Sequence, residues 1–163
     1  MGVAIGIGLL VLSGCGGAKK YPPPPKVDAA FKAKVVLLCT AASTALKAQG
    51  AFPYPSFDPS HPDVSDFPGI AAYEAKTVAT EKSWQSQLQA LGKPTAGGIR
   101  WKKFLTTVNR TVKETVAQQA AAQTGAGAAF TTTYKTLSSE QKTDAKAAQR
   151  IGLPSCNPGK LGS

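Results

Sequence analysis

The sequence predicts an all-α protein, a four-helix bundle with up-down-up-down connections. Composition is the first reason: aromatic residues make up only 7% of the chain, Ala, Thr, Gln and Lys are abundant, and Val and Ile are sparse. Such a balance favours helices over sheets. Periodicity is the second reason, because four segments carry apolar residues at helical spacing. The connections are short except for residues 51–68, which places successive helices antiparallel to one another.

The chain begins with an uncharged apolar run over residues 3–12, which leads into Leu12-Ser13-Gly14-Cys15. The run is too short to span a bilayer but suits a signal peptide. These four residues resemble the lipobox of bacterial lipoproteins. The resemblance implies that signal peptidase II removes residues 1–14, that Cys15 is diacylglycerylated, and that the protein is held extracytoplasmically on the bacterial cell membrane. The alternatives are an ordinary secretory signal with a chance cysteine and a short buried strand.

Residues 15–27 are predicted to be a tether. Four successive prolines, Pro22 to Pro25, cannot continue a helix and favour an extended polyproline conformation. Lys19 and Lys20 can rest on anionic lipid head groups close to the anchor. A proline-rich run can also be the ligand of a recognition domain, but after a lipobox a spacer is the favoured interpretation.

The three cysteines of the chain are Cys15, Cys39 and Cys156. The resemblance assigns the first to lipid, which leaves the other two as an even pair in an oxidising compartment. We therefore expect a disulfide that ties the end of the chain to the first helix. The lipobox, the Ala-rich helices and the terminal Gly152-Leu153-x-x-Cys156 are also similar to uncharacterised small lipoproteins of high-GC Gram-positive bacteria, a likeness that implies no activity.

The first helix is expected over residues 28–49, with Asp28 as its N-cap and Gly50 as its end. The loop that follows, residues 51–68, holds five prolines, which exclude a helix or a central strand. Its aromatic residues predict an ordered loop that packs over the end of the bundle. His61 lies among three aspartates there, a set that fits turn chemistry at least as well as a metal site, so we predict no metal.

The second helix is expected over residues 69–91. Glu74 and Glu81 flank its apolar stripe and lie seven residues apart. Such a pair can serve acid–base chemistry or bind a cation. The favoured interpretation is structural, with each carboxylate paired to a Lys or Arg of a neighbouring helix at the boundary of the core.

The third and fourth helices are expected over residues 96–124 and 128–151. Thr95 is the expected N-cap of the third helix, and Ser138 is a point where the fourth could bend or restart. Residues 157–163 are expected to form a flexible tail. The third helix is the most basic stretch of the chain, and the candidate polyanion contacts on it are Arg100, Lys102, Lys103, Arg110 and Lys113.

Charge and motif content limit the function. The formal net charge is +10, which would attract anionic lipids, acidic wall polymers or nucleic acid. No run of Lys and Arg exceeds two residues, so a generally basic, solvated surface is favoured and nucleic acid is not. The chain carries none of the common nucleophile, phosphate-loop or metal-protease motifs. We therefore predict a protein that is not an enzyme and needs no cofactor.

Two functional hypotheses follow. The favoured one is an interaction or scaffold module that recognises an envelope protein or wall polymer through its basic faces or aromatic loop. The alternative is a small-ligand-binding bundle with residues 51–68 as a lid, which requires a cavity of a few hundred Å³. The candidate ligand or partner contacts are Tyr54, Phe57, His61, Tyr73 and Trp84.

Overall fold

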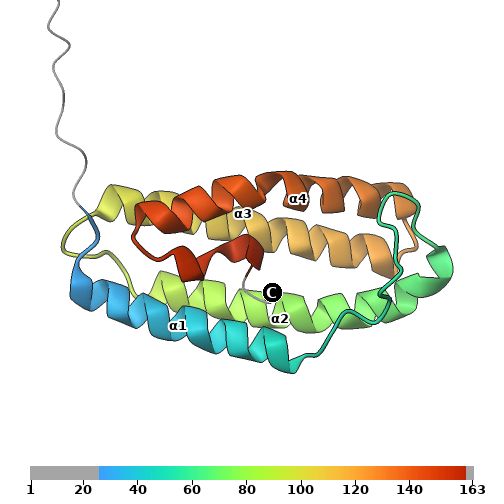
Figure 1. The fold of residues 1–163 in the computed structure, drawn as a ribbon, viewed down its shortest axis with the longest axis horizontal. Helices are drawn as coiled ribbons and strands as arrows, with labels where there is room; N and C mark the ends of the chain where they lie inside the picture. The colour runs from blue at the N-terminus through green and yellow to red at the C-terminus, as the bar shows by residue number, and fades with distance from the viewer. Residues whose placement is uncertain (1–25, 161–163) are drawn as a thin grey trace, which may run out of the picture.

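The computed structural model describes residues 26–160, and in them it is all-α, without strands. The four helices are α1 (Ala29–Ala48), α2 (Phe67–Ala90), α3 (Gly98–Gln123) and α4 (Gly127–Arg150), and they lie alongside one another in a bundle (Figure 1). Single 3₁₀ turns are formed by Val64–Asp66, Pro154–Cys156 and Pro158–Lys160. The predicted all-α bundle is confirmed. The predicted signal peptide, Cys15 and most of the tether lie outside the described residues.

The C-terminal segment completes the bundle. In chain order each helix packs against the next, and the 3₁₀ turn at Pro154–Cys156 contacts both α4 and α1. In Figure 1 this segment turns back from the end of α4 toward α1. There Cys156 forms a disulfide with Cys39 of α1, with 5.3 Å between the two Cα atoms. The predicted disulfide is confirmed, and it indicates an extracytoplasmic location.

Two hydrophobic clusters fill the bundle. The larger surrounds the disulfide and takes in Trp84, Trp101 and Phe104. The smaller lies at the end of the bundle that the 51–66 loop covers, and it is built on Phe67, Ile70 and Phe130. The first described residue lies at the opposite end, beside the α2–α3 connection (Figure 1). The two ends of the bundle are therefore chemically distinct.

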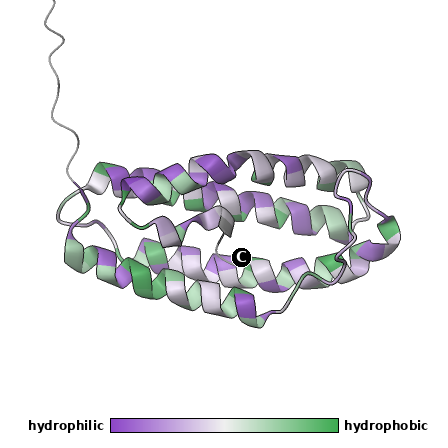
Figure 2. Ribbon diagram, in the orientation of Figure 1, coloured by the Kyte–Doolittle hydropathy of each residue, from purple (hydrophilic) through white to green (hydrophobic). Residues whose placement is uncertain are grey.

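Helix α1 is long and apolar enough, by length and composition, to cross a membrane. Figure 2 shows apolar residues along much of it, whereas hydrophilic residues predominate in α4. A core helix and a signal sequence share this composition. The disulfide at Cys39 and the buried side chains of Phe31, Val35 and Leu46 make α1 a core helix of the bundle.

The start of α3 differs from the prediction. Asp28 caps α1 as expected, since its Oδ1 accepts a hydrogen bond from the Phe31 amide at 2.8 Å. Its Oδ2 accepts from both the amide and the hydroxyl of Thr95, at 3.0 and 2.9 Å. Thr95 is thereby recruited to α1 instead of capping α3, which begins only at Gly98. Gly97 precedes it with φ of 78°, and a Cβ there would lie 2.6 Å from the Val27 backbone nitrogen.

Two further expectations are settled at the C-terminal end. Helix α4 is continuous through Ser138. The expected flexible tail is wrong for residues 157–160: Asn157 is buried, and the last 3₁₀ turn packs on α4 and α3. The physical reason is that the disulfide carries the chain back over the bundle, where Gly159 lies so close to Asp144 that a Cβ would come within 3.3 Å of its Oδ2. The tail thus covers a buried carboxyl.

Candidate ligand-binding site

The 51–66 loop is held by its aromatic rings. Phe52 is at the centre, with ring centroids 6.2 Å from Tyr54, 5.7 Å from Phe57 and 5.4 Å from Tyr73 of α2. Phe57 reaches α4, where its ring meets that of Phe130 edge-on at 5.6 Å. Such contacts each add about 0.5–1.5 kcal/mol beyond burial. They bind the loop to both α2 and α4.

The polar side chains of the loop stabilise its turns through local hydrogen bonds. Asp58 accepts hydrogen bonds from the Ser60 amide at 2.8 Å and contacts His61 Nδ1 at 3.0 Å. The side chain of His61 is 88% exposed and is not part of the lining of the hollow described next. Among residues 26–160, no three His, Cys, Asp or Glu side chains cluster in a way that could hold a metal ion. His61 is thus a surface residue of a turn.

A hollow of about 380 Å³ lies beneath these rings, at the meeting of the loop with α2, α3 and α4. Its floor holds two buried polar side chains, Glu74 and Gln118. Tyr134 of α4 stands at the rim and is 40% exposed. The complete lining is Phe52, Tyr54, Pro55, Phe57, Pro59, Glu74, Gln118, Phe130 and Tyr134. We call this space the aromatic hollow.

The two glutamates of α2 lie in the interior. Glu74 is 9% exposed and Glu81 is 8% exposed. Burial raises the pKa of each carboxyl to about 7, and the neighbouring Glu81 charge adds to the rise at Glu74. A hydrogen bond between Glu81 and the Thr115 hydroxyl partly offsets the rise in the pKa of Glu81, while Glu81 Oε2 has no hydrogen-bond partner among the described residues. The expected pairing with Lys or Arg is wrong: among residues 26–160, neither glutamate is in a salt bridge.

Polar side chains form a buried stripe on α3, which meets Glu81 of α2 through Thr115 and Asp144 of α4 through Thr111. Its residues are buried and recur every three or four positions: Thr107, Thr111, Thr115 and Gln118. The threonine hydroxyls donate to carbonyls one turn earlier, as Thr115 does to Thr111 at 3.0 Å, so they are satisfied within their own helix. This stripe was not predicted from the sequence. The sequence pattern that could have predicted it is the repeat of threonine at every fourth position on an otherwise apolar helix face.

The basic residues of α3 do not form one free surface. The guanidinium of Arg110 is ion-paired with Glu140 at 2.6 Å and with Asp144 at 2.8 Å, both on α4. Burial raises the pKa of Asp144, and the nearby Arg110 charge partly offsets that rise. Arg100 donates to the Arg150 carbonyl at the end of α4, at 2.9 Å. Arg110 therefore joins α3 to α4, and its role as a polyanion contact stays a prediction.

The predicted ligand contacts separate into two groups. Tyr54 and Phe57 line the aromatic hollow, and Tyr73 packs behind Phe52. Trp84 does not belong there: it is 3% exposed, lies in the cluster around the disulfide, and lines a different groove between α1 and α2. Sequence reasoning missed the roles of Glu74, Gln118 and Tyr134, which come from three separate helices.

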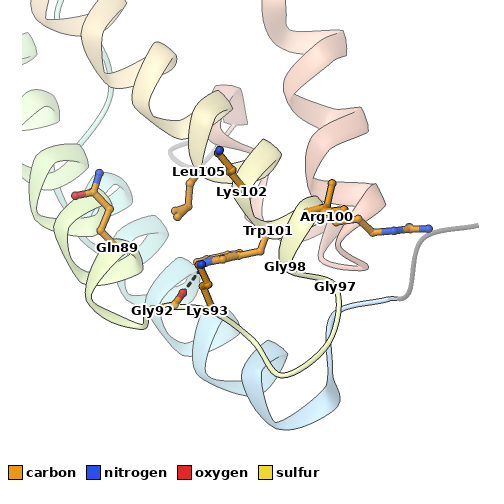
Figure 3. A pocket seen from close by; sticks show the side chains of 10 residues that line it. Gln89, Gly92, Lys93, Gly97, Gly98, Arg100, Trp101, Lys102 and Leu105 are labelled. Carbon is orange, nitrogen blue, oxygen red and sulfur yellow. Dashed lines mark hydrogen bonds between the residues drawn. The ribbon is translucent and has the colours of Figure 1, made fainter.

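A second hollow, of about 650 Å³, lies at the opposite end of the bundle (Figure 3). The indole of Trp101 forms one wall and donates from Nε1 to the Gly92 carbonyl at 2.9 Å. Leu105 adds apolar surface, and Lys93 and Lys102 also line the hollow. We call this space the basal hollow. Away from its rim, the basal hollow has few polar groups that could orient a small polar ligand.

Comparison with protein families, with curated proteins and with solved structures finds no match to this chain. The geometry of the sites must therefore carry the functional assignment. An apolar concavity with a few convergent polar groups and a carboxyl of raised pKa is the usual form of a small-molecule site. The aromatic hollow has all three features.

Proposed function

We propose that this protein is a lipid-anchored, extracytoplasmic binding protein of the cell envelope. Its ligand would be a small organic molecule with an apolar or aromatic body and a hydrogen-bond-donating or cationic group. The observation that carries the proposal is the aromatic hollow, in which the buried side chain of Glu74 and several aromatic side chains line one space. Aromatic faces attract cations, and a carboxylate desolvated beside them adds a charge-assisted hydrogen bond.

Binding without catalysis is the favoured activity. Apart from tyrosine, Glu74 is the one ionisable residue in the lining of the hollow. General acid–base work commonly needs a second positioned group, and covalent catalysis needs an activated nucleophile. The other buried carboxyl, Glu81, is not part of the lining. A single carboxyl on an aromatic wall is suited to recognition.

The proposed anchor is Cys15, and its test is the location of the protein in its own cell. Wild-type protein is expected in the membrane fraction, because diacylglyceryl attachment buries two acyl chains in the bilayer. Cys15→Ser should shift most of the protein to the soluble extracytoplasmic fraction. Cys15→Ser protein that stays in the membrane fraction would exclude the lipobox as the site of attachment.

The proposed ligand is tested by native mass spectrometry of protein purified gently from the producing cell. A mass excess that disappears on denaturation is expected. Glu74→Gln should weaken retention of that mass tenfold or more, since a hydrogen bond to a charged group contributes about 1.5–3 kcal/mol. Tyr134→Ala, at the exposed rim, should weaken it as well.

A matched control for Glu74→Gln is available on the same helix. Glu81→Gln makes the same chemical change at a buried site outside the hollow and should keep the bound mass. Equal losses in both variants would mean that the bound molecule does not contact Glu74. A bare mass in every preparation would reject the ligand-binding proposal.

An interaction or scaffold module remains the second candidate, and one observation favours it. The outer face of α1 exposes Leu37 at 71% and Val36 at 38%, and the groove of about 430 Å³ between α1 and α2 is lined largely by Ala and Ser. Exposed apolar side chains and a groove without charged residues suit an envelope protein better than a wall polymer. Cross-linking in intact cells through Leu37→Cys would identify such a neighbour.

A further inference from the structure

Charge is unevenly distributed between the two ends of the bundle. The end that holds the first described residue comprises residues 26–34, 93–103 and 146–153, and it carries nine Lys or Arg and one acidic residue, Asp28. The end under the aromatic loop, residues 46–76 and 118–135, carries three lysines and four acidic residues. We call the first of these the basic end. The positive net charge of the chain is therefore concentrated at the end of the bundle where residue 26 lies.

An exposed apolar residue stands in the middle of the basic end. Ile99 lies in the first turn of α3 and is 67% exposed. Lys102 and Lys103, both exposed, follow it at i+3 and i+4 and so share its side of the helix. Ile99 also borders two concavities, the basal hollow and a groove of about 300 Å³ between α3 and α4. Apolar surface and lysine stems thus lie together, and Figure 3 shows Lys102 next to the apolar side chain of Leu105.

The course of the chain brings this end toward the membrane. Val27 is buried against the α2–α3 connection, where a side chain on Gly97 would collide with its backbone. Residue 26 is thereby fixed beside Gly97, which lines the basal hollow. It lies eleven positions after Cys15, and a chain of that length can reach at most about 40 Å. A lipid at Cys15 would keep the basic end, and not the aromatic end, near the bilayer.

We propose that the basic end docks on the surface of an anionic lipid bilayer. Lysines bind anionic head groups there while their stems and Ile99 enter the interfacial region, as at other membrane-surface sites. A soluble polyanion would use the lysines but gain nothing from Ile99 or from the apolar walls of the basal hollow. The inference rests on the proposed anchor for the direction of approach, and its chemistry is independent of the lipid on Cys15.

The test uses residues 15–163 with Cys15→Ser, a chain that lacks lipid but keeps the complete core, which begins at Val27. Sedimentation is measured with vesicles of equal parts phosphatidylglycerol and phosphatidylcholine, and with phosphatidylcholine alone. Binding to the anionic vesicles is expected, with little to the neutral ones. Lys102→Gln/Lys103→Gln should weaken it about 25-fold, since each lysine contributes about fivefold.

Matched variants at the other end separate a docking face from net charge alone. Lys47→Gln/Lys135→Gln makes the same change in charge at the aromatic end and should weaken binding less than twofold. Ile99→Ser should weaken it several-fold, while Val64→Ser, at a residue 63% exposed in the 51–66 loop, should have no effect. All of these positions are exposed, so circular dichroism is expected to show unchanged folding.

Three results would overturn the proposal. The first is equal loss of binding in the two lysine pairs, and the second is equal binding to neutral and anionic vesicles. The third is soluble polyphosphate bound as tightly as vesicles, with no effect of Ile99→Ser, which would identify an anionic polymer as the partner. Failure of the Cys15 anchor would show instead in the cell fractionation of full-length protein and would leave the vesicle result intact.

Discussion

Removing the disulfide by Cys156→Ser is expected to lower the free energy of unfolding by about 4–5 kcal/mol. The bond joins residues 117 positions apart, and cross-linking so long a loop removes much of the conformational entropy of the unfolded chain. Both cysteines are also buried in the main core, at 3% and 0% exposure, where an unbonded serine hydroxyl would be unfavourable. Guanidinium unfolding monitored by circular dichroism measures the change.

The controls separate the covalent bond from the packing around it. Reducing conditions should lower the unfolding free energy of the wild-type protein by a similar amount. The unfolding free energy of Cys39→Ala/Cys156→Ala should match that of the reduced protein. Cys15→Ser should leave the unfolding free energy unchanged. A loss below about 1 kcal/mol on reduction would mean that the closed loop contributes little, and that the two sulfurs act only as buried apolar groups.

The stability of the protein is expected to fall as the pH rises from about 4.5 to about 7. In the folded state burial raises the pKa of Glu74 and Glu81 to about 7, from an ordinary value of 4.5. Between these values the folded state binds more protons than the unfolded state, so the unfolding free energy decreases with pH. The effect is on the order of 3 kcal/mol for each carboxyl at pH 8, and it is complete above the folded pKa.

Glu81→Gln isolates one of the two carboxyls. At pH 8 the variant should be more stable than wild type by about 2–3 kcal/mol, because a neutral amide avoids the cost of a buried charge. At pH 4.5 the two proteins should be nearly equal. Glu114→Gln, at a half-buried position of α3, serves as the control and should change the unfolding free energy little at either pH. A wild-type profile that is flat from pH 5 to pH 8 would contradict the burial of ionisable carboxyls.

The helices and the disulfide could be predicted because their signals are local or simple. Apolar spacing predicts the helices, Asp28 has the chemistry and position of the N-cap of α1, and the pairing of Cys39 with Cys156 follows once the lipobox resemblance assigns Cys15 to lipid. The start of α3 could not be found this way. Thr95 has the chemistry of an N-cap, but Asp28, 67 residues earlier, takes its hydrogen bonds. A contact over that distance in sequence leaves no local signal.

Only the aromatic loop residues of the candidate site could be predicted from the sequence. The aromatic residues of the loop stood out among prolines, so their packing over the bundle could be anticipated. Glu74 and Gln118 of the floor could not, because a carboxyl beside an apolar stripe looks the same whether solvent or another helix faces it. The α3 residues that face the two glutamates here are Gln118, in the hollow with Glu74, and Thr115, beside Glu81, and neither carries a charge. Which polar groups meet in the interior depends on the rotation of each helix, and periodicity leaves that angle undetermined.

The disulfide also decides how the protein would respond to a pulling force. Tension between a surface tether at the N-terminus and a partner holding the C-terminus would run along residues 26–39, cross the sulfur–sulfur bond and leave after Cys156. Residues 40–155, which include all of α2, α3 and α4, lie in parallel with a covalent bond and carry no load. Stretching would unravel the first half of α1 and the terminal turn, while the aromatic hollow would keep its shape.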